Sequence, residues 1–286
     1  MNGDAELHAD RGFTLVELLV VMGIITVLIA LLMPALGKVR KHALEVKCAA
    51  NLRSMGQALT MYTQQYGYYP GGSLYAPPTG EYALWPVRLR AFMGGDQTSF
   101  YCPSADERCE WKKDGPAPYG RATAHQPGFG YEAGEPLLDW ARSFFSYGYN
   151  AWGAGGVGVD DTFAQRGLGP AVMPRHLPLT PRDRDRYREM RVTRVRRPAR
   201  TIAIADSTPD GFWDFGVLPN VSDGRHGHLP RWVGTLHRGG ANFLFCDGHV
   251  EWYPRSEHLL DGQRPDKIEK RAIWCMWNND HEPHYD

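Results

Sequence analysis

Three side chains near the C-terminal end of the sequence have the chemistry of metal ligands: His237, Asp247 and His249. One carboxylate and two imidazoles could hold a transition metal, and the same side chains serve in hydrolases. An Asp-Gly pair between apolar runs is, however, also the strongest short signal for a β-hairpin turn. The sequence contains no nucleophile elbow, HExxH motif or phosphate-binding loop. We therefore expect no enzyme activity and no cofactor, and a metal site at these three residues is the lesser alternative.

The five cysteines are an odd number, too few for a disulfide scaffold. Six residues separate Cys102 from Cys109, and outside the cytoplasm this spacing permits a small disulfide loop. Two separate thiols are the alternative. A metal site with two cysteines would need further ligands that the sequence does not identify.

Glu17 is the only charged residue between Phe13 and Met33. About 20 apolar residues at ~1.5 Å each form a helix that can cross a bilayer core. A cleaved secretory signal would have a basic start and a shorter apolar run, whereas the preceding MNGDAELHADRG is acidic except for Arg11. A carboxylate at the bilayer centre costs about 2.5–3.5 kcal/mol. Glu17 therefore needs a cationic partner, or it reaches the membrane interface.

The helical pattern continues beyond the apolar segment. Apolar residues recur at steps of three or four, and they are Leu44, Cys48, Leu52, Met55, Leu59, Tyr62 and Tyr66. Gly67 and Pro70 end the pattern. We predict one helix over 13–66, transmembrane over 13–33 and amphipathic over 34–66, with Pro34 as a point of kinking and Cys48 as a small core residue.

The remaining residues, 67–286, predict a β-rich domain, so the fold class is α+β with an antiparallel sheet against the long helix. Residues 68–82 predict a loop, residues 83–93 a short helix or strand, and residues 143–153 and 201–207 strands. The strongest signal predicts a hairpin over 237–253 with Asp247-Gly248 as a two-residue type I′ loop.

The net charge of the chain does not indicate a polyanionic partner. Acidic and basic residues balance at 32 each. The segment 175–200 holds ten arginines but lacks a recognisable nucleic-acid fold. We therefore expect no nucleic acid as a partner.

The stretch RGFTLVE, from Arg11 to Glu17, resembles the processing site of type IV prepilins and type II secretion pseudopilins. The resemblance implies that prepilin peptidase removes a leader, residues 1–12, by cutting after Gly12, and that the new terminus Phe13 is N-methylated. It also implies that Glu17 meets the Phe13 amine of a neighbouring subunit during assembly.

The same resemblance implies a location and partners. The chain would be a single-pass inner-membrane protein with a periplasmic domain over 67–286, and it would reach a surface filament if assembled. Its partners would be prepilin peptidase and other pilin or pseudopilin subunits. The basic residues Lys38, Arg40 and Lys41 follow the span and would favour the opposite orientation by the positive-inside rule, but the processing motif is the more specific signal.

His237, nine residues, then Asp247-Gly248 resembles the H-X9-DG motif of prepilin-like proteins abundant in planctomycetes, verrucomicrobia and their relatives. The sequences CPS at Cys102, SYGYN at Ser146 and WNND at Trp277 also resemble that group.

Three functions remain in view. The chain could be a structural filament subunit, a membrane-anchored extracytoplasmic module that binds carbohydrate through Trp-rich loops, or a surface hydrolase. The third predicts a deep pocket with converging polar groups. We expect the first, with the second as its alternative.

Overall fold

A computed structural model describes residues 14–76, 81–118, 120–122, 130–138, 143–150, 167–168, 171–172, 189–209, 216–217, 233–254 and 275–278. The chain divides into two compact units, Met1–Ala43 and Leu44–Asp286. The long helix contributes to both units.

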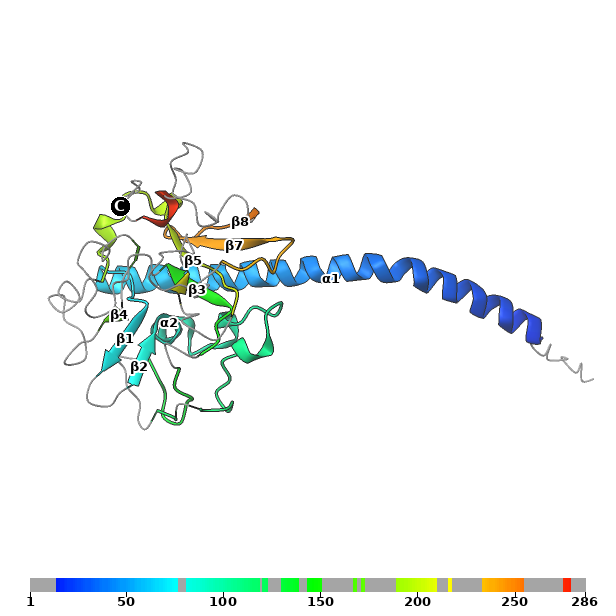
Figure 1. Ribbon diagram of the computed structural model, residues 1–286, viewed down its shortest axis with the longest axis horizontal. Helices are drawn as coiled ribbons and strands as arrows, with labels where there is room; N and C mark the ends of the chain where they lie inside the picture. The colour runs from blue at the N-terminus through cyan, green and yellow to red at the C-terminus, as the bar shows by residue number, and fades with distance from the viewer. Residues whose placement is uncertain are drawn as a thin grey trace, which may run out of the picture. The chain divides into compact units, whose positions relative to one another are not determined.

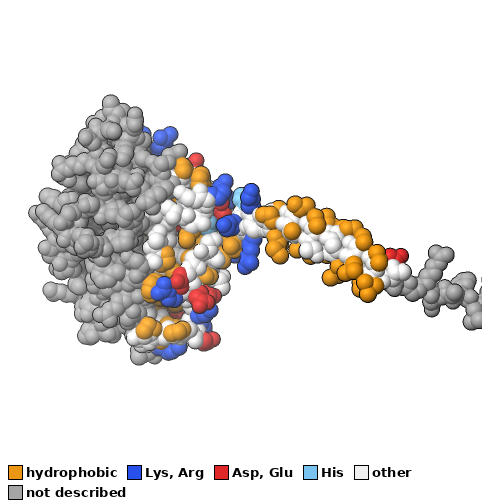
Figure 2. Space-filling view, turned by 45° about the vertical axis from the view of Figure 1, so that its right-hand side comes forward, with side chains coloured by type: hydrophobic (Ala, Val, Ile, Leu, Met, Phe, Trp, Pro, Cys, Tyr) orange, Lys and Arg blue, Asp and Glu red, His pale blue; other side chains and the backbone are white. Residues whose placement is uncertain are grey.

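Helix α1, Leu15–Tyr66, confirms the predicted helix and continues through Pro34. All its residues from Leu15 to Ala43 are exposed. By length and composition, α1 can cross a membrane. Figure 2 shows hydrophobic side chains covering this stretch, followed by a group of Lys and Arg side chains. A helix that is apolar on all sides is stable in lipid, where its backbone hydrogen bonds are satisfied internally.

The second unit begins with the part of α1 that carries the predicted stripe. Cys48, Leu52, Met55, Leu59 and Tyr62 are buried, as expected from their spacing. The buried face also includes four residues that the apolar pattern did not contain: Glu45, Asn51, Gly56 and Ala58.

A five-stranded sheet forms the main layer of this unit, in the order β6-β3-β5-β7-β8. Its strands are β3 (Tyr147–Asn150), β5 (Ile202–Asp206), β6 (Gly216–Val217), β7 (Gly240–Phe245) and β8 (Val250–Pro254). Neighbours pair antiparallel except β3 and β6, which are parallel. Strand β5 confirms the prediction over 201–207. Strand β3 confirms the prediction over 143–153 for Tyr147–Asn150, and residues 151–153 lie outside the described residues.

A second sheet has the order β2-β1-β4, with β1 at Ser73–Ala76, β2 at Glu81–Leu84 and β4 at Ala171–Val172. The predicted loop over 68–82 is therefore partly wrong. β1 pairs antiparallel with β2 and parallel with β4, and these ladders stabilise strands in a Gly- and Pro-rich stretch.

The remaining helices are short. The prediction for residues 83–93 was a short helix or a strand, and the structure has helix α2 there, Trp85–Arg90. Pro86 lies in its first turn, where proline is favoured. The 3₁₀ turns are η1 (Ala91–Met93), η2 (Thr98–Phe100), η3 (Glu107–Cys109), η5 (Val192–Arg194) and η6 (Pro198–Arg200).

The main hydrophobic core joins α1 residues from Cys48 onward with residues of β2, α2, β3, β5 and β7. In Figure 1 this end of α1 runs between the strands labelled β1 and β2 and those labelled β7 and β8. The α+β class is confirmed, but the sheets are mixed rather than purely antiparallel.

Candidate functional site

The predicted cleavage residues Gly12 and Phe13 lie outside the described residues. The first described residue is Thr14, which precedes the first turn of α1. The Thr14 amide and hydroxyl donate to Glu17 Oε2 at 2.9 and 2.7 Å, and the Glu17 amide donates to Thr14 Oγ1 at 3.3 Å. This reciprocal arrangement is a capping box, which satisfies amides at the helix start that have no partner within the helix.

The capping box gives Glu17 a role within its own chain. The role of Thr14 was not predicted, although a Thr followed three residues later by Glu before an apolar run is the sequence signature of this cap. Two donors from Thr14 reduce the cost of a carboxylate in an apolar segment, because part of its lost hydration is replaced.

The predicted hairpin over 237–253 is present as β7 and β8, but its turn differs from the expected one. The Gly248 amide donates to the Phe245 carbonyl and the Phe245 amide to the His249 carbonyl, both at 2.9 Å. The loop thus has three residues, and Gly248 takes φ +95° at its end. A type I′ turn would need positive φ at Asp247 too, and among the described non-glycine residues only Arg238 has it.

The predicted metal ligands do not come together. The Asp247 carboxylate lies 2.6 Å from His249 Nδ1 at the turn. His237 pairs with Gly240 at the opposite end of β7. Since a strand rises about 3.3 Å per residue, β7 holds the two ends roughly 20 Å apart. The alternative prediction of a metal site formed by His237, Asp247 and His249 is therefore wrong.

The disulfide prediction also needs correction. Cys48 of α1 bonds to Cys102, with Cα atoms 5.2 Å apart, whereas Cys109 is a buried thiol. The Cys102 amide donates to Ser146 Oγ at 2.8 Å, which fixes the segment beside α1 and β3. The buried stripe of α1 thereby places Cys48 within disulfide reach of Cys102. Cys48 is a core residue, as predicted, but its sulfur is bonded to Cys102, which was not predicted.

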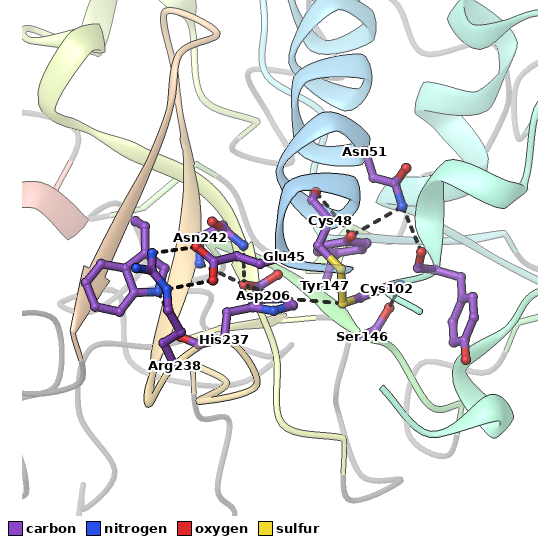
Figure 3. A network of polar contacts seen from close by, with 12 residues as sticks. Glu45, Cys48, Asn51, Cys102, Ser146, Tyr147, Asp206, His237, Arg238 and Asn242 are labelled. Carbon is purple, nitrogen blue, oxygen red and sulfur yellow. Dashed lines mark hydrogen bonds and ion pairs between the residues drawn. A yellow bond between two sulfur atoms is a disulfide. The ribbon is translucent and has the colours of Figure 1, made fainter. Parts of the chain in front are cut away.

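His237 is buried beside this disulfide. Its Nε2 lies 3.4 Å from Cys102 Sγ and 3.6 Å from Asp206 Oδ2 (Figure 3). The Asn242 amide and side chain donate to Asp206 Oδ2 at 2.7 and 3.1 Å. No described residue provides a hydrogen bond to Asp206 Oδ1.

Burial decides the ionisation of this pair. It raises the pKa of Asp206 to about 7, against the two hydrogen bonds from Asn242. It also lowers the pKa of His237. Both shifts favour the neutral forms, since a charge in this dry interior is costly.

Arg238 links the start of the hairpin to α1. Its guanidinium donates from Nε and Nη2 to the two oxygens of Glu45 at 2.7 and 2.6 Å, and it stacks 4.7 Å above the Trp252 ring. Trp252 Nε1 in turn donates to the His237 carbonyl at 2.8 Å. The bidentate pair fixes the orientation of the guanidinium as well as its position.

The turn end of the hairpin also contacts α1. A Cβ atom added to Gly56 would lie 2.7 Å from Leu244 Cδ1 and 3.2 Å from the Gly248 carbonyl oxygen. A Cβ atom on Gly248 would face Thr60 Oγ1 at 3.8 Å. The H-X9-DG segment thus packs along α1 at both ends, through Arg238 at Glu45 and through Gly248 at Gly56.

The other short motifs lie in the same interior. Ser146 holds Cys102, and Asn150 Nδ2 donates to the carbonyls of Ile202 and Trp277 at 2.8 and 3.0 Å. Trp277 is fully buried against Phe243. These contacts indicate that the motifs stabilise the fold.

Comparison with known proteins gives one match. Residues 7–33 match the family model of the prokaryotic N-terminal methylation motif. No curated protein and no solved structure matches the chain. The match supports a prepilin-type signal, which implies processing by prepilin peptidase, and with the apolar helix it indicates membrane anchoring. The similarity to prepilins is confined to residues 7–33, so it describes the N-terminal signal of the chain.

Proposed function

We propose that the chain is a structural, non-enzymatic subunit of a type IV pilus or of a type II secretion-like filament. The observation that carries this proposal is the methylation motif over residues 7–33 placed directly at the start of an exposed apolar helix. The apolar surface from Leu15 to Leu36 would lie in the inner membrane before assembly and among the helices of other subunits afterwards.

Glu17 supports the proposal at the level of mechanism. In the single chain its carboxylate is held by Thr14 alone among the described residues. Cleavage after Gly12 would create a cationic amine at Phe13, and the Phe13 amine of a neighbouring subunit would give Glu17 a charged partner. In the proposed filament this ion pair would help to specify the packing register of the helix.

The orientation of the C-terminal unit is part of the proposal. Disulfides persist in oxidising compartments, and Cys48–Cys102 lies in the unit that begins at Leu44. The disulfide therefore supports a periplasmic position for that unit.

The proposal is tested by the N-terminus of the purified protein. Mass spectrometry should find N-methylated Phe13 as the first residue, and Gly12→Ala should retain residues 1–12 because the peptidase must approach the backbone there. Gly37→Ala is a matched control, since a Cβ atom at Gly37 meets nothing within 4 Å. Recovery of an intact leader on exported protein would overturn the proposal.

One observation favours the anchored binding module as a second candidate. A pocket of about 540 Å³ is lined by the aromatic residues Phe100, Trp111, Phe144 and Phe145 and by several prolines. Aromatic side chains that line a pocket suit contact with a sugar ring.

Binding of soluble oligosaccharides to the purified protein tests this second candidate. Titration followed by tryptophan fluorescence should saturate, and Trp111→Leu should abolish the response. Trp252→Leu, which alters a tryptophan outside the pocket lining, is the matched control. A response unaffected by Trp111→Leu would count against the pocket.

A further inference from the structure

The buried cluster beside the hairpin contains more ligand chemistry than a disulfide needs. Sulfur atoms of Cys48 and Cys102 and a ring nitrogen of His237 all lie within 4.8 Å of one another. The Asp206 carboxylate lies 3.6 Å from the same nitrogen, His237 Nε2. These four side chains come from α1, the Cys102 segment, β5 and a position three residues before the start of β7, and the fold brings them together (Figure 3).

The two distances from His237 Nε2 to its neighbours agree with those between ligands of one zinc ion. Zinc binds Cys sulfur at about 2.3 Å and His nitrogen or carboxylate oxygen at about 2.0–2.2 Å. Neighbouring ligands of a tetrahedral site are then roughly 3.3–3.8 Å apart. His237 Nε2 has Cys102 Sγ at 3.4 Å and Asp206 Oδ2 at 3.6 Å, and both distances fall in this range.

Two features of the cluster are poorly explained by a disulfide alone. Oδ1 of the fully buried Asp206 has no hydrogen-bond partner among the described residues. A disulfide sulfur is also only a weak acceptor for the nearby imidazole. A cation bound among these side chains would satisfy both, since buried carboxylates without a partner are costly.

We propose that Cys48, Cys102, His237 and Asp206 bind a Zn²⁺ ion when the Cys48–Cys102 disulfide is reduced. The disulfide and the zinc site are alternative states of the same four side chains. The oxidised state links Cys48 to Cys102 covalently, and the reduced state links the same two residues through the metal.

The interconversion balances with a dithiol as the reductant. The dithiol supplies two electrons and two protons, becomes a disulfide itself, and leaves Cys48 and Cys102 as thiols. Zinc then binds the two thiolates and the Asp206 carboxylate, and the two thiol protons and the proton of a neutral Asp206 pass to solvent. His237 and Asp206 contribute a neutral imidazole and a carboxylate without changing oxidation state.

Metal titration of the full-length protein in detergent tests the proposal. The fully reduced chain, freed of reductant, should bind one Zn²⁺ per chain, and the oxidised chain should bind none. With Co²⁺ the reduced chain should show thiolate-to-cobalt charge transfer and the visible bands of a tetrahedral site. Zn²⁺ should also raise the melting temperature of the reduced chain alone.

Variants separate this site from adventitious binding at other cysteines. Cys102→Ser should lose the metal and the cobalt bands. Asp206→Asn removes a charged ligand, so it should weaken binding at least as much as the roughly 10–100-fold loss caused by removing an outer-shell partner. Cys109→Ser, which alters a buried cysteine outside the cluster, should bind like the parent. A reduced parent chain that binds no metal, or a cobalt spectrum that survives Cys102→Ser and disappears in Cys109→Ser, would overturn the proposal.

Discussion

At the scale of single residues, Glu17 and His237 show how the surroundings decide what a polar side chain does. Glu17 lies in an exposed apolar helix and accepts hydrogen bonds from Thr14, which keeps the carboxylate at the helix start. His237 is buried among a disulfide and a carboxylate from distant parts of the chain. The first arrangement is local and the second depends on the whole fold.

The account predicts that assembly requires the charge of Glu17. Glu17→Gln keeps an oxygen that can accept from Thr14 but cannot attract a neighbour's amine, and Glu17→Val removes both. Both variants should insert in the membrane and fold normally from Leu44 onward, yet both should be depleted from the sheared filament fraction in immunoblots.

Thr14→Val is the matched control for this prediction, because it removes the hydroxyl of the capping box and keeps the charge. It should assemble much better than either Glu17 variant. Parent-like amounts of the Glu17→Gln chain in filaments would show that the cap, and not the ion pair, is the function of this residue.

At the scale of elements, the β7–β8 hairpin is positioned by its close approach to α1. Gly56→Val should lower the free energy of unfolding of the C-terminal unit by about 1–3 kcal/mol, because the added atoms collide with Leu244 and with the Gly248 backbone. Gly37→Val adds the same atoms to α1 at an open position and should cost less than about 0.5 kcal/mol. Denaturant unfolding measures both, and equal losses would contradict the packing described.

A second element-scale prediction concerns the disulfide. Without reductant, trypsin should release residues 48–53 linked to residues 91–108, because Arg108 separates Cys102 from Cys109. Removal of the bond in Cys102→Ser should cost about 2–4 kcal/mol of stability, whereas Cys109→Ser should leave the linkage intact. A linked pair of 91–108 with 109–112 would restore the short loop that the sequence suggested.

The helices and strands that could be predicted from the sequence are those with a regular spacing of apolar residues. The three- and four-residue spacing from Leu44 to Tyr62 and the apolar run Ile202–Ala205 predicted α1 and β5, since burial follows such periods directly. The β1 strand was missed because Gly and Pro around Ser73 indicate loops, and only pairing with β2 and β4 stabilises a strand there.

The partners of the buried cluster could not be predicted in this way. Cys48 and Cys102 are 54 positions apart, and Asp206 and Asn242 are 36 apart. Such contacts depend on topology, which single-chain periodicity does not specify. The nearby pair Asp247 and His249 was correctly placed at a turn, but proximity in sequence wrongly suggested that His237 would join them.

At the scale of the whole molecule, the chain combines a motif-bearing apolar helix with a folded unit that begins at Leu44. In the proposed filament the first would provide the packing surface and the second would be displayed outside the membrane. The disulfide and the H-X9-DG hairpin then attach α1 to the rest of the folded unit. A pulling force applied to α1 in the filament would therefore also act on that unit.

The most direct test of this account is the composition of filaments sheared from cells that produce the protein. The sheared fraction should contain the chain, and its mass spectrum should show N-methylated Phe13 as the first residue. Processed chain found entirely in the inner membrane, with none in sheared material under conditions where filaments form, would contradict the role of filament subunit and favour the anchored module.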